Sequence, residues 1–80
     1  MNQSDFLKVV LPFKDKVFRL SKRLLTSIEE AEDATQELLF KLWKNRDKIA
    51  GYRNTEAFAM TMTKNYCYDR LKSKQANNLT

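Results

Sequence analysis

Residues Ala31 to Trp43, AEDATQELLFKLW, decide the fold of this 80-residue chain. They lie within a longer predicted helix that begins at Ser27 and continues to about Arg46. Ser27 precedes Glu30 by three residues, a capping-box spacing in which the serine oxygen accepts from a first-turn amide and the glutamate reaches back. The acidic side chains that follow crowd the positive end of the helix dipole, where negative charge is stabilising. This is the clearest helix signal in the chain.

One side of this helix is apolar and predicts a core-facing stripe, because successive residues advance by about 100°. The stripe comprises Ile28, Ala31, Thr35, Leu38, Leu39 and Leu42. The opposite side is centred on Phe40 and carries Asp33, Gln36, Glu37 and Lys44, with Trp43 at its edge.

This opposite side has two interpretations. Aromatic rings beside carboxylates and an amide are typical of a docking surface for a basic partner. Alternatively, the N-terminal segment folds over Phe40 and the acids are simply solvated, as most charged helix faces are.

Length and composition indicate one small domain, with a core limited by its size. The single cysteine, Cys67, has no partner for an internal disulfide, and the chain contains no histidine. An unpaired thiol fits a reducing environment, so we expect a cytoplasmic protein. We expect no membrane insertion, because no apolar run is long enough to span a bilayer and the first residues lack the layout of a signal peptide.

The net charge of +5 is unevenly distributed. Residues 1–40 carry six basic and seven acidic side chains, a net charge of −1, whereas residues 41–80 carry nine and three, a net charge of +6. A basic second half favours a polyanionic partner, although excess lysine also serves solubility alone.

The fold class predicted for the chain is all-α, because one glycine and one proline leave few interruptions. A first helix is expected from Asp5 to Leu25, kinked or broken at Pro12. After a very short turn at Thr26 and Ser27, it should pack antiparallel to the central helix.

A loop of about eight residues, 47–54, should follow the central helix and lead to Thr55 as the next N-cap. The third helix is expected from Glu56 to about Lys74, with residues 75–80 as a polar tail. Its predicted core stripe is Phe58, Ala59, Met62, Tyr66 and Asp69. A carboxylate on a buried stripe needs a partner, so we expect Asp69 to pair with a basic group such as Arg46 or Arg53, or with a loop amide.

Together these elements predict a small three-helix bundle formed by residues 1–74. The residues expected near its centre are Phe18, Leu38, Leu42, Phe58 and Met62.

Catalysis finds no support in the sequence, so we expect no enzyme, no metal site and no cofactor. There is no Ser–His or Cys–His pair, no glycine-rich phosphate loop and no cluster of metal ligands. Cys67 near Lys64 is most simply an ordinary thiol.

Nucleic-acid binding has better support, because cations and tyrosines alternate in the loop and the third helix. These residues are Lys48, Tyr52, Arg53, Lys64, Tyr68, Arg70 and Lys72. Cations follow phosphates and tyrosines stack on exposed bases, a combination that suits single strands. A helix-turn-helix is disfavoured, because the loop is about twice as long as the three- or four-residue turn that motif requires.

The run with Asp33, Gln36, Glu37 and Trp43, followed by KNYCYDRLK with Asn65 and Asp69, resembles region 2 of bacterial extracytoplasmic-function (ECF) sigma factors. The resemblance covers about residues 6 to 74. It implies a transcription initiation module whose central helix docks on the clamp helices of the RNA polymerase β′ subunit. The residues implied in that contact are Asp33, Gln36, Glu37, Leu39 and Trp43, and Phe40 is added because it lies at the centre of the same helix side.

The resemblance also implies that the loop and third helix capture and melt the promoter minus-ten element, holding a flipped base of the non-template single strand. The residues implicated in DNA binding, by position or by the charge pattern, are Lys48, Tyr52, Arg53, Met60, Thr61, Lys64, Asn65, Tyr68 and Lys72. Expected partners are core RNA polymerase, promoter DNA and an anti-sigma factor. Such proteins carry a second, helix-turn-helix domain, so we expect this chain to be a fragment that ends in the linker.

A second hypothesis stays open at this point. The chain would then be a helical protein–protein interaction module or regulator that uses the Phe40–Trp43 face and does not bind DNA. The basic loop and third helix distinguish the two hypotheses, because the second leaves them unexplained.

Overall fold

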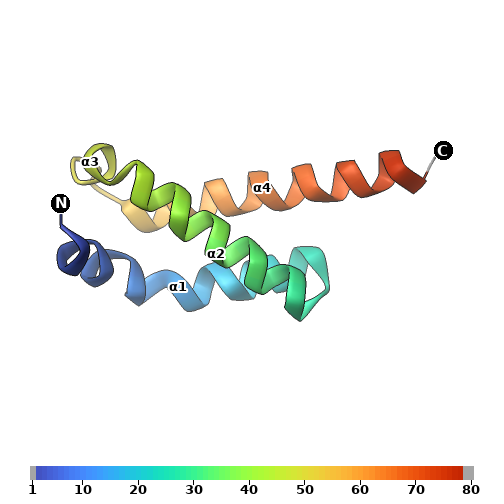
Figure 1. The fold of residues 1–80 in the computed structure, drawn as a ribbon, viewed down its shortest axis with the longest axis horizontal. Helices are drawn as coiled ribbons and strands as arrows, with labels where there is room; N and C mark the ends of the chain where they lie inside the picture. Colours follow the sequence, from blue (N-terminus) through green and yellow to red (C-terminus); the bar gives the residue numbers. More distant parts are fainter. Residues whose placement is uncertain (1, 79–80) are drawn as a thin grey trace.

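The computed structural model describes the backbone of residues 2–78 and the side chains of residues 2–73. Its elements are α1 (Gln3–Leu25), α2 (Ile28–Lys44), α3 (Arg46–Ile49) and α4 (Thr55–Asn78). No strand occurs within the described residues, and the all-α prediction is confirmed. α1 and α4 run in the same direction, and α2 returns between their ends in the opposite direction (Figure 1). α1 packs against both other long helices.

Helix α1 is continuous through Pro12, so of the kink or break predicted there, the break is wrong. It begins at Asn2, whose Oδ1 accepts from the amide of Asp5 at 2.8 Å. Proline removes one backbone donor, but Pro12 is exposed, whereas Val10 and Phe13 on either side of it are buried. Packing of this buried face keeps the helix continuous where local propensity alone favours an interruption.

The turn between α1 and α2 is as short as predicted. Thr26 adopts a left-handed conformation with φ of 56°, and its amide bonds to the carbonyl of Lys22 at 2.8 Å. Ser27 caps α2, since its Oγ accepts from the amide of Glu30 at 3.3 Å. This connection turns the chain back at once and makes α1 and α2 antiparallel neighbours (Figure 1).

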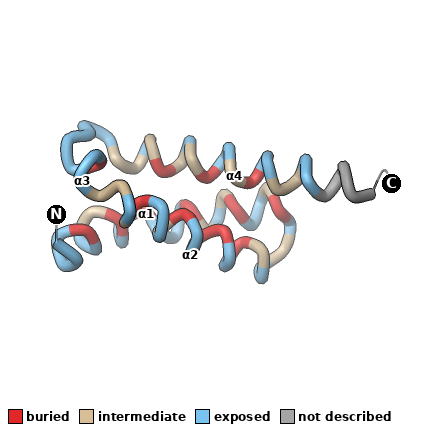
Figure 2. The backbone as a smooth tube through the Cα atoms, turned by 45° about the horizontal axis from the view of Figure 1, so that its top comes forward, coloured by how far each residue is buried: buried red, intermediate tan, exposed pale blue. Residues whose placement is uncertain are grey.

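The main core is one cluster to which all four helices contribute, and its buried positions recur along the inner side of each helix (Figure 2). Its members are Phe6, Val10, Phe13, Val17, Leu38, Leu42, Ile49 and Ala59. Of the predicted central residues, Leu38 and Leu42 are buried, while Phe58 and Met62 are half-buried beside the cluster.

Two residues of α1 and α2 that were expected in the core lie outside it. Ile28 is 55% exposed, because it is the first residue of α2 and lies beyond the overlap with the other helices. Phe18 is half-buried and lines a surface groove between α1 and α2.

The segment predicted as an eight-residue loop contains the one-turn helix α3. Ile49 in α3 is 2% exposed, and its burial pins the segment to the core. The cap of α4 is Asn54 rather than Thr55, since Asn54 Oδ1 accepts from the amide of Ala57 at 2.9 Å. Both residue types are good caps, so the sequence alone favoured neither strongly.

The core stripe of α4 differs from the predicted one. The buried residues are Ala59, Thr63 and Cys67, spaced by four, and Asp69 is exposed. Asp69 is therefore not a buried structural carboxylate, and the predicted need for a partner disappears. Small side chains line the side of α4 that packs between α1 and α2, because helices that approach closely leave little room. The larger Phe58 and Tyr66 flank this seam.

α4 continues to Asn78, beyond its predicted end at Lys74. The last residues of the predicted tail, Leu79 and Thr80, lie outside the described residues. No helix in the described part of the chain is both long and apolar enough to cross a bilayer.

Candidate binding surfaces

The outer side of α2 presents an acidic and aromatic surface, which we call the acidic face: Asp33, Gln36, Glu37 and Phe40. All four residues are exposed, and Phe40 retains 51% of its accessible surface. The ammonium group of Lys44 lies 4.5 Å from the centre of the Phe40 ring. The alternative in which the N-terminal segment covers Phe40 is therefore wrong.

The N-terminal segment covers the other large aromatic, Trp43. The rings of Phe6 and Trp43 meet edge to face at 5.1 Å between centroids. On Trp43 the guanidinium carbon of Arg46 lies 4.2 Å from the ring centre, and Nη1 of Arg46 donates to the Trp43 carbonyl at 3.1 Å. Trp43 and Leu39 are thus half-buried and adjoin the acidic face at its α1 side, so only part of each side chain can reach a partner.

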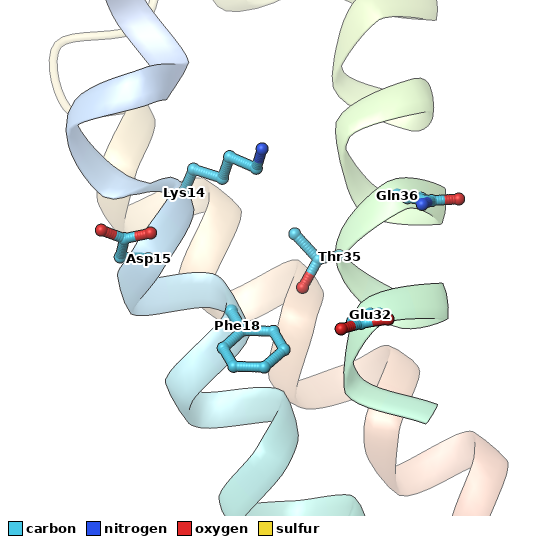
Figure 3. A pocket seen from close by; sticks show the side chains of 6 residues that line it. All are labelled: Lys14, Asp15, Phe18, Glu32, Thr35 and Gln36. Atoms are coloured by element: carbon cyan, nitrogen blue, oxygen red, sulfur yellow. The ribbon is translucent and has the colours of Figure 1, made fainter. Parts of the chain in front are cut away.

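A groove of about 200 Å³ separates α1 from α2 beside the acidic face (Figure 3). Lys14 and Phe18 reach from α1 toward α2, while Asp15 points away from it (Figure 3). The opposite wall is formed by Glu32, Thr35 and Gln36. Sequence reasoning missed this groove because it assigned Phe18 to the core, although Phe18 follows the buried Val17 and is therefore rotated by about 100° from it.

Five of the predicted DNA-binding residues form one exposed row along α4, which we call the outer row. They are Thr61, Lys64, Asn65, Tyr68 and Lys72. At about 100° per residue, this row lies opposite the buried seam of Ala59, Thr63 and Cys67. The ammonium group of Lys64 lies 5.8 Å from the centre of the Tyr68 ring. The outer row therefore presents amide, hydroxyl, cationic and aromatic groups together.

The predicted loop residues form a second, separate group. Lys48, Tyr52 and Arg53 are exposed, and the Tyr52 ring packs edge to face on Phe58 at 5.0 Å between centroids. Asn65 lies ten residues into α4, about 15 Å along its axis from the start. The structure thus does not bring Asn65 together with the loop residues.

Met60 lies apart from both groups. It is half-buried, packs against the main core and lines a groove next to α1. Arg70, part of the basic pattern in the sequence, is half-exposed and already has partners within the domain: its Nη2 lies 3.6 Å from Glu30 Oε1, and its Nη1 donates to the Tyr66 hydroxyl at 3.3 Å.

The Cys67 thiol is a structural group. Its side chain is fully buried, and its pKa is raised because burial disfavours the thiolate more than the nearby Ser21 hydroxyl and Arg70 charge favour it. A buried neutral thiol is unreactive. The described residues also include no group of three or more potential metal ligands.

The family described as Sigma-70 region 2 matches residues 9–77, and the chain belongs to that family. The predicted resemblance to region 2 of an ECF sigma factor is confirmed.

The curated relatives that the chain resembles include ECF sigma factors. It is 30% identical over 74 residues to the ECF RNA polymerase sigma factor SigW of Bacillus subtilis (strain 168), covering 92% of this chain and 40% of the relative. It is 27% identical over 78 residues to the ECF RNA polymerase sigma factor SigK of Mycobacterium tuberculosis (strain ATCC 25618 / H37Rv), covering 96% and 42% respectively. The chain thus spans about two fifths of the length of these relatives. No solved structure matches it. The names of these relatives describe sigma factors rather than enzymes, in agreement with the expectation that the chain is not an enzyme.

Proposed function

We propose that this domain serves transcription initiation in the cytoplasm by bridging core RNA polymerase and promoter DNA. The observation that carries the proposal is that a member of the sigma-70 region 2 family exposes two chemically different helix surfaces. The acidic face of α2 suits a basic protein partner, and the outer row of α4 suits a nucleic-acid strand. Membership of the ECF group also suggests an anti-sigma factor as a regulatory partner.

The polymerase contact is assigned to the acidic face, with the exposed parts of Leu39 and Trp43 at its margin. Phe40 is the best candidate for an anchor, because a large exposed aromatic surrounded by polar groups is typical of the centre of a protein interface. Asp33 and Glu37 then provide acceptors for arginine or lysine side chains of the β′ clamp helices.

The DNA contact is assigned to the outer row together with Lys48, Tyr52 and Arg53. Tyr52 is well suited to a base-binding loop, because its packing on Phe58 restrains the loop before the strand arrives. Capture of an unpaired base of the non-template strand would stabilise the melted minus-ten element.

The substitution Glu37→Lys tests the polymerase contact. Glu37 is exposed and lies away from the helix caps, so the change should alter the free energy of unfolding by no more than about 0.5 kcal/mol. Affinity for core polymerase should fall at least tenfold, because a cation replaces an acceptor. Fluorescence-anisotropy titration of labelled domain with core polymerase measures the affinity.

Asp15→Lys is the matched control, since it makes the same charge change at an exposed residue of α1 that lies at the edge of the groove, outside the acidic face, and points away from α2 (Figure 3). It should bind polymerase as wild type does. Equal affinities for wild type and Glu37→Lys would remove Glu37 from the contact, and no polymerase binding by the wild-type chain would instead favour a regulator with another partner.

Lys64→Ala and Asn65→Ala test the DNA contact in reconstituted polymerase on a promoter with a pre-melted bubble. Lys64→Ala should weaken matched and scrambled bubbles alike and reduce the salt dependence of binding, because phosphate contacts carry no sequence information. Asn65→Ala should instead reduce the preference for the matched bubble. If Asn65→Ala weakens both bubbles equally, base recognition belongs to the loop residues Tyr52 and Arg53.

A further inference from the structure

Helix α1 carries more positive charge than any other element of the fold. Residues 3–25 contain six basic and two acidic side chains, a net charge of +4, whereas residues 28–44 contain two and five, a net charge of −3. The net charge of residues 1–40 does not reveal the positive charge of α1, because most of the acidic helix α2 lies in the same half of the chain and offsets it. The basic surface of the molecule therefore extends beyond the loop and α4.

Part of this charge lines a groove between α1 and α4. The groove has a volume of about 220 Å³ and is lined by Lys16, Arg19, Leu20, Arg23 and Met60. The three cations come from one side of α1, at a spacing of three and four residues, and Leu20 and Met60 supply the apolar lining. Met60, predicted at the sequence level to contact DNA, is thus surrounded by cations from a helix that the prediction did not include.

The cations at this groove differ in how they are held. Nζ of Lys16 lies 3.2 Å from one carboxylate oxygen of Glu56 and 3.3 Å from the other, which ties α1 to the first turn of α4. Arg19 and Arg23 are exposed, and no carboxylate of the described residues forms an ion pair with either. As an i, i+4 pair on a helix, their Cβ atoms lie about 5–6 Å apart. Two neighbouring guanidinium groups without an internal anion are suited to an external one.

The groove continues into the outer row of α4. Met60 faces the groove, and Lys64 follows it by four residues, so the two side chains lie on neighbouring angles of the helix, about 40° apart. Lys64 therefore lies on the α1 side of the outer row. Lys64 and then Tyr68, which is 43% exposed, follow Met60 along α4 at intervals of four residues, so the outer row begins beside the groove that Arg19 and Arg23 line.

We propose that Arg19 and Arg23 bind the sugar–phosphate backbone of the DNA strand that crosses α4, with Leu20 and Met60 against its sugars. This inference rests on the proposed DNA-binding function and adds α1 to the DNA-binding surface. The occupant is DNA rather than an acidic protein because the groove adjoins Lys64 and Tyr68, where cationic and aromatic groups suit a strand. The contact is sequence-independent and sets affinity and register.

The test compares Arg19→Ala/Arg23→Ala with Lys8→Ala/Lys22→Ala, which removes the same charge from exposed residues of α1 that do not line the groove. Each variant is assembled with core polymerase, and affinity for matched and scrambled pre-melted bubbles is measured across a salt series. Log affinity falls with log salt, and each lost phosphate contact reduces the steepness of that fall by about 0.7–0.9. The arginine variant should therefore lose about 1.4–1.8 from the slope, equally on both bubbles, and the control should match wild type.

Two further measurements separate the possible failures. Thermal unfolding and polymerase affinity of the arginine variant should equal those of wild type. Three results would overturn the groove assignment. The first is a wild-type slope for the arginine variant, and the second is an equal loss of slope in the lysine control. The third is an unchanged DNA slope combined with a loss of affinity for polymerase or for an acidic protein partner. If the wild-type assembly itself fails to prefer the matched bubble, the proposed promoter recognition fails instead.

Discussion

Thr26 is the one residue outside glycine that adopts a positive φ within the described chain. Its left-handed conformation ends α1 and allows Ser27 to begin α2 without any intervening residue. For a residue with a side chain this conformation costs about 1–2 kcal/mol, and branching at Cβ makes threonine an unusual choice. The fold tolerates this cost because the turn sets the antiparallel pairing of α1 and α2.

Thr26→Gly should raise the free energy of unfolding by about 0.5–1 kcal/mol, because glycine adopts the left-handed region without a Cβ penalty and only part of the gain is lost to a more flexible unfolded chain. Urea unfolding monitored by circular dichroism measures the change.

Thr26→Ala is the control for loss of the threonine hydroxyl, which donates to the Leu25 carbonyl at 2.7 Å. Alanine keeps the Cβ atom and should give little gain. Equal effects of the two variants would show that the backbone conformation is not the source of the cost.

At the scale of the elements, the N-cap of α4 is a position where residue preference allows two candidates and the structure shows one. Asn54 and Thr55 are adjacent residues that both favour the cap position. The observed bond from the Ala57 amide goes to Asn54 at 2.9 Å, and the Phe58 amide bonds to the Asn54 carbonyl at 3.3 Å. The cap also fixes where the loop with Tyr52 joins the helix.

Asn54→Ala should lower the free energy of unfolding by about 1 kcal/mol, the usual loss for a cap residue. Thr55→Ala should change it by less than about 0.5 kcal/mol, because Thr55 is already a helical residue. Thermal unfolding of both variants measures the difference. The reverse order of effects would restore Thr55 as the cap.

At the scale of the whole molecule, the three long helices and α3 depend on one main core. Its buried residues come from α1, α2, α3 and α4, so each helix buries its apolar side only by packing against the other helices. The chain's single tryptophan, Trp43, contacts Phe6 at the end of the α1–α2 pair that lies away from the turn. Its fluorescence therefore reports tertiary packing, while circular dichroism reports helix content.

Leu42→Ala should lower the free energy of unfolding by about 2–5 kcal/mol, because Leu42 is fully buried at the centre of the core. Tryptophan fluorescence and circular dichroism should lose their signals in one coincident transition, in the variant as in wild type. A tryptophan transition that precedes loss of helix would show that α1 and α2 separate before the helices unfold.

The sequence by itself determined the features that depend on neighbouring residues. The cap at Ser27, the apolar period through Leu38 and Leu42, and the scarcity of glycine and proline predicted α2 and an all-α fold, and local spacing alone sufficed. The run from Asp33 to Trp43, together with Asn65 and Asp69 in the third helix, also predicted the family, which the comparison confirms.

Only the tertiary structure decided which of these side chains are available to a partner. Trp43 is half-covered because Phe6, at the start of the antiparallel helix α1, lies beside it near the end of α2, while Phe40 stays exposed. Because α1 and α4 pack closely, the buried side of α4 is the one with Thr63 and Cys67, and Asp69 is exposed. The same packing places the cations of α1 beside Met60. Contacts such as Lys16–Glu56 join residues forty positions apart. Periodicity within one helix identifies its apolar side but carries no information on the angle and distance at which another helix packs there.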